Sequence, residues 1–131
     1  MKIDSILIDW QLNDGEAESL IKEAIKPLHF NLPDDYVQFL GRHNGGEGFV
    51  GDYYLILWRA EELVPFNRDY ETMKYAPGII LFGSNGGGEG YGFDTRYPSM
   101  PVVKIPFIGM ELRYAKEVAT SLTDLIDRLS R

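Results

Sequence analysis

The chain has 131 residues, of which 44% are hydrophobic and 13% aromatic, and this is typical of one folded domain with its own core rather than of a disordered chain. It contains no cysteine and only two histidines, which excludes disulfide scaffolds, thiolate chemistry and cysteine-based zinc sites. Its formal net charge of −7 disfavours direct binding of nucleic acid and favours a basic protein partner.

The N-terminal segment, residues 1–12, permits two interpretations. Four apolar residues have helical spacing: Ile3, Ile6, Leu7 and Trp10. The apolar run at residues 6–8 suits a short strand instead, and both interpretations stay open. The segment has one lysine, two aspartates and no long apolar run, so it does not resemble a signal peptide. No stretch of the chain approaches the roughly 20 apolar residues of a membrane span, and we expect a soluble, cytoplasmic protein.

Two helices are predicted in the first third of the chain. The first begins at residues 13–16, where Asn13 or Asp14 can cap it, and it ends near Pro27. Its apolar stripe comprises Leu20, Ile21, Ala24, Ile25 and Leu28. The second begins at Pro33 and ends in the glycines of residues 41–46. Its buried face comprises Tyr36, Val37, Phe39 and Leu40. We expect His29 and His43 to lie near the ends of these helices and to cap them.

Short strands and turns dominate the rest of the chain. We predict strands over residues 49–58, 79–82, 91–94 and 102–105, a helical turn over 59–63 that Pro65 interrupts, a short helix over 67–74 and a C-terminal helix over 115–129. This order predicts an α+β fold, in which a mostly antiparallel β-sheet is flanked by helices within a single domain over residues 1–131.

Eleven of the 14 glycines fall in two windows, residues 41–51 and 83–92. The second window superficially resembles a nucleotide cradle. A phosphate loop needs a lysine followed by serine or threonine, and a dinucleotide loop must open a helix, whereas here Glu89 and a strand follow. Because a carboxylate among the backbone amides repels phosphate, we predict a hairpin turn held by structural glycines.

Four acids accompany these windows: Glu47, Asp52, Glu89 and Asp94. Two carboxylates that converge can perform acid–base catalysis or bind a divalent cation, but the sequence does not show convergence, and solvated turn acids are the simpler interpretation. No serine lies in the Gly-x-Ser-x-Gly setting of a serine hydrolase. We therefore expect no catalytic residue, no cofactor and no metal site.

Four aromatic residues cluster over residues 49–58: Phe49, Tyr53, Tyr54 and Trp58. Aromatic residues in a half-buried strand usually belong to the core. Tyrosine and tryptophan are also enriched at interface hot spots, so any exposed member of this set is a candidate contact residue.

Several motifs together resemble the SUKH superfamily, which includes fungal cell-wall-assembly regulators and many bacterial immunity proteins. The run LPDDYVQFL at residues 32–40, followed by Asn44-Gly45-Gly46, is similar to the signature LPxDYxxFL…NGG. Further stretches resemble one bacterial branch: GEGFVG at 46–51, LFGSNGGGE at 81–89 with FDTR at 93–96, and VKIPFIGM at 103–110. The resemblance runs in order from Trp10 to Leu129.

This resemblance implies an α+β fold, no catalysis and a protein-binding module that neutralises a cognate polymorphic toxin, often a nuclease, by direct contact. The acidic composition fits such a partner, because a nuclease presents positive charge to phosphates. Because turn acids project outward, we expect Glu47, Asp52, Glu89 and Asp94 to contact the partner, in a monomer or weak homodimer. The alternatives are a regulatory interaction module unrelated to toxins and a small metal- or nucleotide-dependent enzyme.

Overall fold

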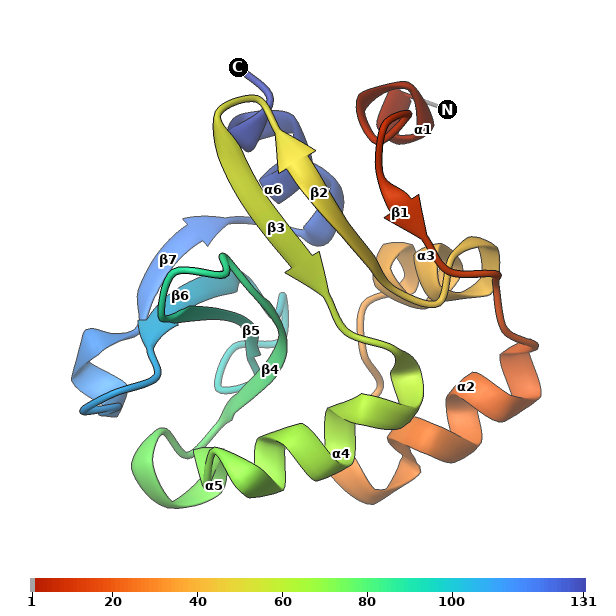
Figure 1. The fold of residues 1–131 in the computed structure, drawn as a ribbon. Helices are drawn as coiled ribbons and strands as arrows, with labels where there is room; N and C mark the ends of the chain where they lie inside the picture. The colour runs from red at the N-terminus through yellow and green to blue at the C-terminus, as the bar shows by residue number, and fades with distance from the viewer. Residues whose placement is uncertain (1) are drawn as a thin grey trace.

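A computed structural model describes residues 2–131, and its centre is one antiparallel sheet of seven strands that follow one another in chain order (Figure 1). The strands are β1 (Gln11–Leu12), β2 (Gly46–Val50), β3 (Tyr53–Leu57), β4 (Ile79–Ser84), β5 (Glu89–Asp94), β6 (Val102–Pro106) and β7 (Lys116–Ala119). Every strand pairs with its neighbour in the sequence, so the sheet is a meander, and the predicted α+β fold with an antiparallel sheet is confirmed.

Helices flank this sheet. They are α1 (Lys2–Ile6), α2 (Glu18–Ile25), α3 (Asp34–Arg42), α4 (Ala60–Asp69), α5 (Thr72–Tyr75) and α6 (Leu122–Leu129), with short 3₁₀ turns η1 (Lys26–Leu28) and η2 (Leu112–Tyr114). Figure 1 shows the β2–β3 hairpin projecting at one end of the molecule beside α6, while α4 and α5 run along the opposite end. Helix α2 packs against α4, and α3 contacts both α2 and α6.

The centre of the core is a cluster of three aromatic rings. Tyr36 of α3 meets Phe82 of β4 at 5.5 Å and Phe93 of β5 at 5.1 Å, and the two phenylalanine rings stack at 4.5 Å between centroids. All three side chains are fully buried. The predicted second helix is confirmed, because α3 places Tyr36, Phe39 and Leu40 on the core side.

The β2–β3 hairpin diverges from the rest of the sheet, and this divergence creates the groove described below. Strands β3 and β4 pair only at Ile56 with Ser84 and at Leu57 with Gly83. Further along β4, the amide side chain of Asn67 in α4 replaces the missing strand. The Leu81 N–H donates to Asn67 Oδ1 at 2.8 Å, and Asn67 Nδ2 donates to the Leu81 carbonyl at 2.9 Å.

Residues 49–58 do not form the single strand that we predicted. They belong to two strands, β2 and β3, joined by a turn at Gly51 and Asp52. Gly51 has φ +60°, and a Cβ there would lie 2.5 Å from the Leu129 carbonyl oxygen, so glycine is required.

The predicted break at Pro65 is also wrong, because α4 continues through this exposed residue as far as Asp69.

The C-terminal helix begins later than predicted. Residues 116–119 form strand β7 against β6, and α6 begins only at Leu122. Ser121 caps this helix, since its Oγ accepts from the Asp124 N–H at 3.0 Å.

The helix predicted over residues 13–27 is also shorter than expected. Helix α2 begins at Glu18, and Leu20, which we predicted on its apolar stripe, is exposed. Asn13 does not cap it, because its Nδ2 donates to the Asn44 carbonyl instead.

The helical interpretation of the N-terminal segment holds for its beginning, whereas the strand interpretation of residues 6–8 is wrong, because residue 6 ends a helix and residues 7–9 form a turn. Residues 2–6 form α1 and residues 11–12 form β1, while Met1 lies outside the described residues. Trp10, between the two elements, is buried and donates from its indole N–H to the Phe49 carbonyl at 2.9 Å. Gly48 leaves room for the Trp10 ring, because a Cβ there would lie 2.4 Å from it.

Candidate functional site

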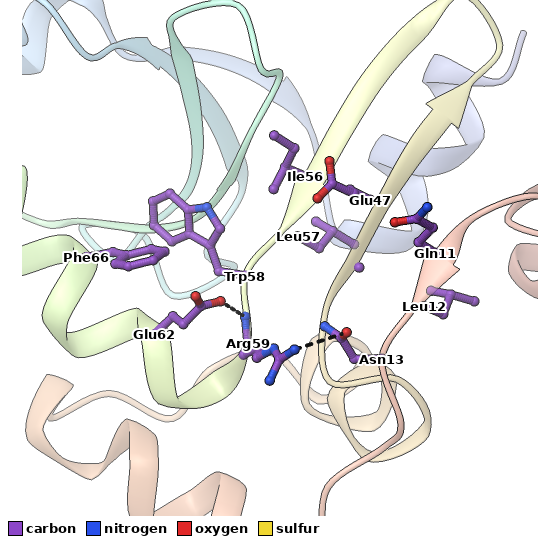
Figure 2. A pocket seen from close by; sticks show the side chains of 11 residues that line it. Gln11, Leu12, Asn13, Glu47, Ile56, Leu57, Trp58, Arg59, Glu62 and Phe66 are labelled. Carbon is purple, nitrogen blue, oxygen red and sulfur yellow. Dashed lines mark hydrogen bonds between the residues drawn. The ribbon is translucent and has the colours of Figure 1, made fainter.

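A polar groove of about 360 Å³ lies between the β2–β3 hairpin and the beginning of α4 (Figure 2). It is lined by Gln11, Leu12, Asn13, Gly46, Glu47, Ile56, Leu57, Trp58, Arg59, Glu62 and Phe66. The lining comes from β1, β2, β3 and α4, so segments more than 50 residues apart in the sequence meet there.

The register of the first three strands explains which side chains face the groove. Gln11 pairs with Glu47, and Glu47 pairs with Ile56, so these three residues project from the same face of the sheet. Phe49 and Tyr54 form the next pair on that face. The alternate residues Val50 and Leu55 point to the other face and are buried in the core.

Glu47 is the acid at the centre of this surface. Its side chain is exposed, and its Oε2 accepts from the Tyr54 hydroxyl at 2.6 Å. The hydrogen bond to the Glu47 carboxylate raises the pKa of Tyr54 above its ordinary value. Phe49 packs edge-on against Tyr54 at 5.0 Å. Gln11 and Glu47 also line a second, adjoining hollow with Asp9, Phe49 and Tyr54, so one acidic and aromatic surface extends along the hairpin.

The α4 side of the groove is held by hydrogen bonds (Figure 2). The Arg59 backbone N–H donates to Glu62 Oε1 at 2.9 Å, and the Arg59 guanidinium donates to Asn13 Oδ1 at 3.4 Å. Trp58 and Phe66 pack edge-on at 5.0 Å. The lining of the groove therefore has acids on both walls, Glu47 and Glu62, and one cation, Arg59.

The structure separates the four predicted contact acids. Glu47 and Asp52 lie on the same projecting hairpin, and Asp52, at its tip, is exposed and makes no hydrogen bond or ion pair within residues 2–131. Glu89 begins β5 elsewhere on the sheet, where its Oε1 accepts from Asn85 Nδ2 at 3.1 Å and lies 3.8 Å from Lys104 Nζ. Asp94 ends the same strand, about 16 Å from Glu89 at the usual rise per residue.

The expectation that Asp94 projects outward is wrong. The residue is only 3% exposed, because Arg96, two positions later, folds back onto it. Arg96 Nε and Nη2 donate to the two Asp94 carboxylate oxygens at 2.9 and 2.8 Å, and the Arg96 backbone N–H also donates to Oδ1. These hydrogen bonds hold the pKa of Asp94 below its ordinary value despite burial. Asp94 is therefore a structural residue in this fold.

Replacing Asp94 by asparagine is expected to lower the free energy of unfolding by about 1 kcal/mol at pH 7, a modest loss because Arg96 is partly exposed. Since the folded-state pKa is lowered, the carboxylate stabilises the fold fully above about pH 5. That contribution declines as the pH falls through the ordinary aspartate value of 3.8 and is lost below the folded-state pKa. The stabilities of the wild-type protein and of Asp94→Asn should therefore become equal at low pH, and urea denaturation between pH 2 and 7 measures both. Asp52→Asn is the matched control, and a pH-independent difference for Asp94→Asn would contradict the assignment.

The glycine-rich segment is the hairpin turn that the sequence predicts. Strands β4 and β5 pair on either side of it, with Gly86 and Gly88 at φ +72° and +99°. Side chains already bond its amides: Asn85 Oδ1 accepts from the N–H groups of Gly87 and Glu89, at 2.8 and 3.1 Å. These amides are therefore occupied within the chain. No group of three histidine or acidic side chains within residues 2–131 is arranged to hold a metal ion.

The aromatic residues of the hairpin divide into two groups. Trp58 is buried, whereas Phe49 and Tyr53 are 65% and 57% exposed, and these two remain candidate contact residues. The sequence did not indicate Gln11, Asn13, Arg59 or Glu62 as site residues, because each is ordinary in its local context and only the fold brings them together. His43 lies at the C-terminal end of α3 and His29 follows η1, as predicted.

Comparison with known proteins identifies the family. Residues 15–128 match the model of the SMI1 / KNR4 family (SUKH-1), and this match covers most of the chain. A search of curated proteins found no match. No helix within residues 2–131 has the length and apolar character needed to cross a membrane. The chain therefore belongs to the SMI1 / KNR4 family (SUKH-1), and it is a protein-interaction domain of the SUKH superfamily.

Proposed function

We propose that this protein is a non-enzymatic immunity protein that binds a basic toxin domain through the groove and the adjoining face of the β2–β3 hairpin. The observation that carries the proposal is the position of Glu47. Its exposed carboxylate stands where the two hollows meet, between the aromatic side chains of the hairpin and the polar end of α4.

The composition of this surface suits a cationic protein segment. A lysine or arginine side chain can form an ion pair with Glu47 and pack its stem or guanidinium against Phe49 and Tyr54. The net charge of −7 would steer a basic partner toward the protein at long range. A nuclease is one such partner, because its active surface must attract phosphates.

The charge reversal Glu47→Lys tests this interface. We expect it to weaken binding of the toxin domain, which this proposal expects a neighbouring gene to encode, by about 10–100-fold, because the mutation replaces an attraction with a repulsion at the centre of the contact. Glu23→Lys makes the same charge change at an exposed position of α2 and should leave the affinity within about twofold. Binding is measured by calorimetry at two salt concentrations, and protection by survival of cells that express the toxin.

The possible outcomes separate the function from the site. If the wild-type protein neither binds nor neutralises the encoded toxin, the immunity function is wrong. If it neutralises the toxin and Glu47→Lys does so equally well, the function stands and the groove is not the interface. A circular-dichroism melting curve for each variant shows that a lost affinity does not come from unfolding.

A further inference from the structure

A second pocket, of about 330 Å³, lies on another side of α4 from the groove. It is enclosed by the loop after η1, by α4 and α5, and by the beginning of β4. Glu62 and Phe66 of α4 line the groove, whereas Val64 and Arg68 line this pocket. Because two residues advance a helix by about 200°, these pairs lie on nearly opposite faces of α4, and the two sites are separate.

The interior of this pocket is apolar. Ile79 and Ile80 are buried at its base, and Leu28 and Val64 contribute partly buried aliphatic side chains. Phe30 and Met73 stand at the mouth, 44% and 86% exposed. Its volume falls within the range of about 300–1,000 Å³ that is usual for small-molecule sites, and such sites are lined mainly by apolar side chains with a few polar groups.

The polar groups of the pocket select the charge of its ligand. No aspartate or glutamate belongs to the lining, although acids outnumber basic residues in the chain by 20 to 13. Arg68 does line it, and its guanidinium makes no ion pair or hydrogen bond with any residue of the described chain. Thr72, also in the lining, has a buried hydroxyl without a hydrogen-bond partner among residues 2–131. An unpaired cation and an unsatisfied hydroxyl are the groups that a carboxylate satisfies.

We propose that this pocket binds an apolar monocarboxylate, with the hydrocarbon body in the pocket and the carboxylate against Arg68. The planar guanidinium matches the two oxygens of a carboxylate. Two sources supply this chemistry: a free carboxylic acid, and the C-terminus of a polypeptide that ends in an apolar residue. The proposal is independent of toxin binding, because Arg68 and Glu47 belong to different sites.

Ligand titrations followed by protein NMR test the proposal with matched pairs of probes. The free-acid pair is 3-phenylpropanoate and its neutral amide, and the peptide pair is N-acetyl-alanyl-leucine and its C-terminal amide. We expect at least one carboxylate to bind with a dissociation constant below about 1 mM and to bind at least about tenfold more tightly than its amide, since a charge-assisted hydrogen bond contributes more than a neutral one. The pair with the tighter carboxylate identifies the source.

Substitutions at two exposed positions test whether the carboxylates bind in this pocket. Arg68→Gln should weaken carboxylate binding at least about tenfold and change amide binding by less than twofold. Met73→Glu places a negative charge at the mouth and should have the same selective effect. Lys116→Gln, which removes an exposed cation of β7 outside the pocket, is the control and should change neither. The proposal is overturned if no probe binds at millimolar concentration, if amides bind as well as acids, or if Arg68→Gln leaves the preference intact.

Discussion

Replacing Phe93 by alanine is expected to lower the free energy of unfolding by about 3–5 kcal/mol, which is the range observed for large aromatic truncations in protein cores. The Phe93 ring is fully buried, stacks on Phe82 at 4.5 Å and meets the Tyr36 ring edge-on. Its removal leaves a cavity between α3 and the strands β4 and β5, and these strands cannot move to fill it without breaking sheet hydrogen bonds. Urea denaturation measures the loss.

Phe49→Ala is the matched control for this prediction. Phe49 is the same residue type in the same sheet, but it lies on the exposed face of the hairpin. We expect this substitution to cost less than about 1 kcal/mol, because little apolar surface is lost from the interior. Equal losses for Phe93→Ala and Phe49→Ala would show that the three-ring cluster is not the centre of the core.

The parts of the fold that the sequence predicts correctly are those with local signals. Helix α3 has a proline before its first turn, two acids within it and an apolar face at helical spacing, so its position follows from residues 33–42 alone. The β4–β5 hairpin combines an apolar run with glycines whose positive φ angles a turn requires. In both cases local propensity and tertiary packing favour the same structure.

The errors arise where a distant segment decides the structure. Residues 116–119 form a strand because β6 offers an edge to them, although their composition suits a helix equally well. Helix α4 contains Pro65, which normally interrupts a helix, yet Leu63 and Phe66 on either side pack against the core and hold the helix together. Neither contact is visible in the sequence near the residues concerned.

The candidate site could be predicted only in part for the same reason. Glu47 and Asp52 were identified because they follow glycines in a turn-rich segment, and both do lie on an exposed hairpin. Asp94 also accompanies a glycine-rich window, but Arg96 pairs with it and the residue is buried. The groove forms only where β1, β3 and α4 meet. The residues of α4 that line it are more than 10 positions from those of β2, so no local pattern in the sequence indicates it.

Asn44 connects three elements beside this groove. It follows α3, and its backbone N–H donates to the Asp14 carbonyl at 3.1 Å. Its side-chain Oδ1 accepts from the N–H of Ala60, the first residue of α4, at 2.8 Å. Its Nδ2 donates to Glu61 Oε1, also at 2.8 Å. Asn44 is buried, and it caps α4 although it lies 16 residues before Ala60 in the sequence.

Replacing Asn44 by alanine is expected to lower the free energy of unfolding by about 3 kcal/mol. The substitution leaves the buried Ala60 N–H without an acceptor, which costs about 1–3 kcal/mol, and it also removes the hydrogen bond to the Glu61 carboxylate. Asn31→Ala, at an exposed position, is the control and should cost less than about 0.5 kcal/mol. Urea denaturation at pH 7 compares the two variants, and equal stabilities would contradict the capping role.

A titration of Glu61 by NMR provides a local readout of the same substitution. In the native protein the Glu61 backbone N–H and then the Asn44 amide lower the pKa of the Glu61 carboxyl below its ordinary value of 4.5. Loss of the amide should move the pKa of Glu61 upward, whereas a general loosening of the core would not single out Glu61.

Asn44→Ala should impair partner binding only as far as it unfolds the protein, while Glu47→Lys, three residues away, should impair binding without unfolding. If Asn44→Ala weakened binding at full stability, Asn44 would belong to the contact surface rather than to its scaffold.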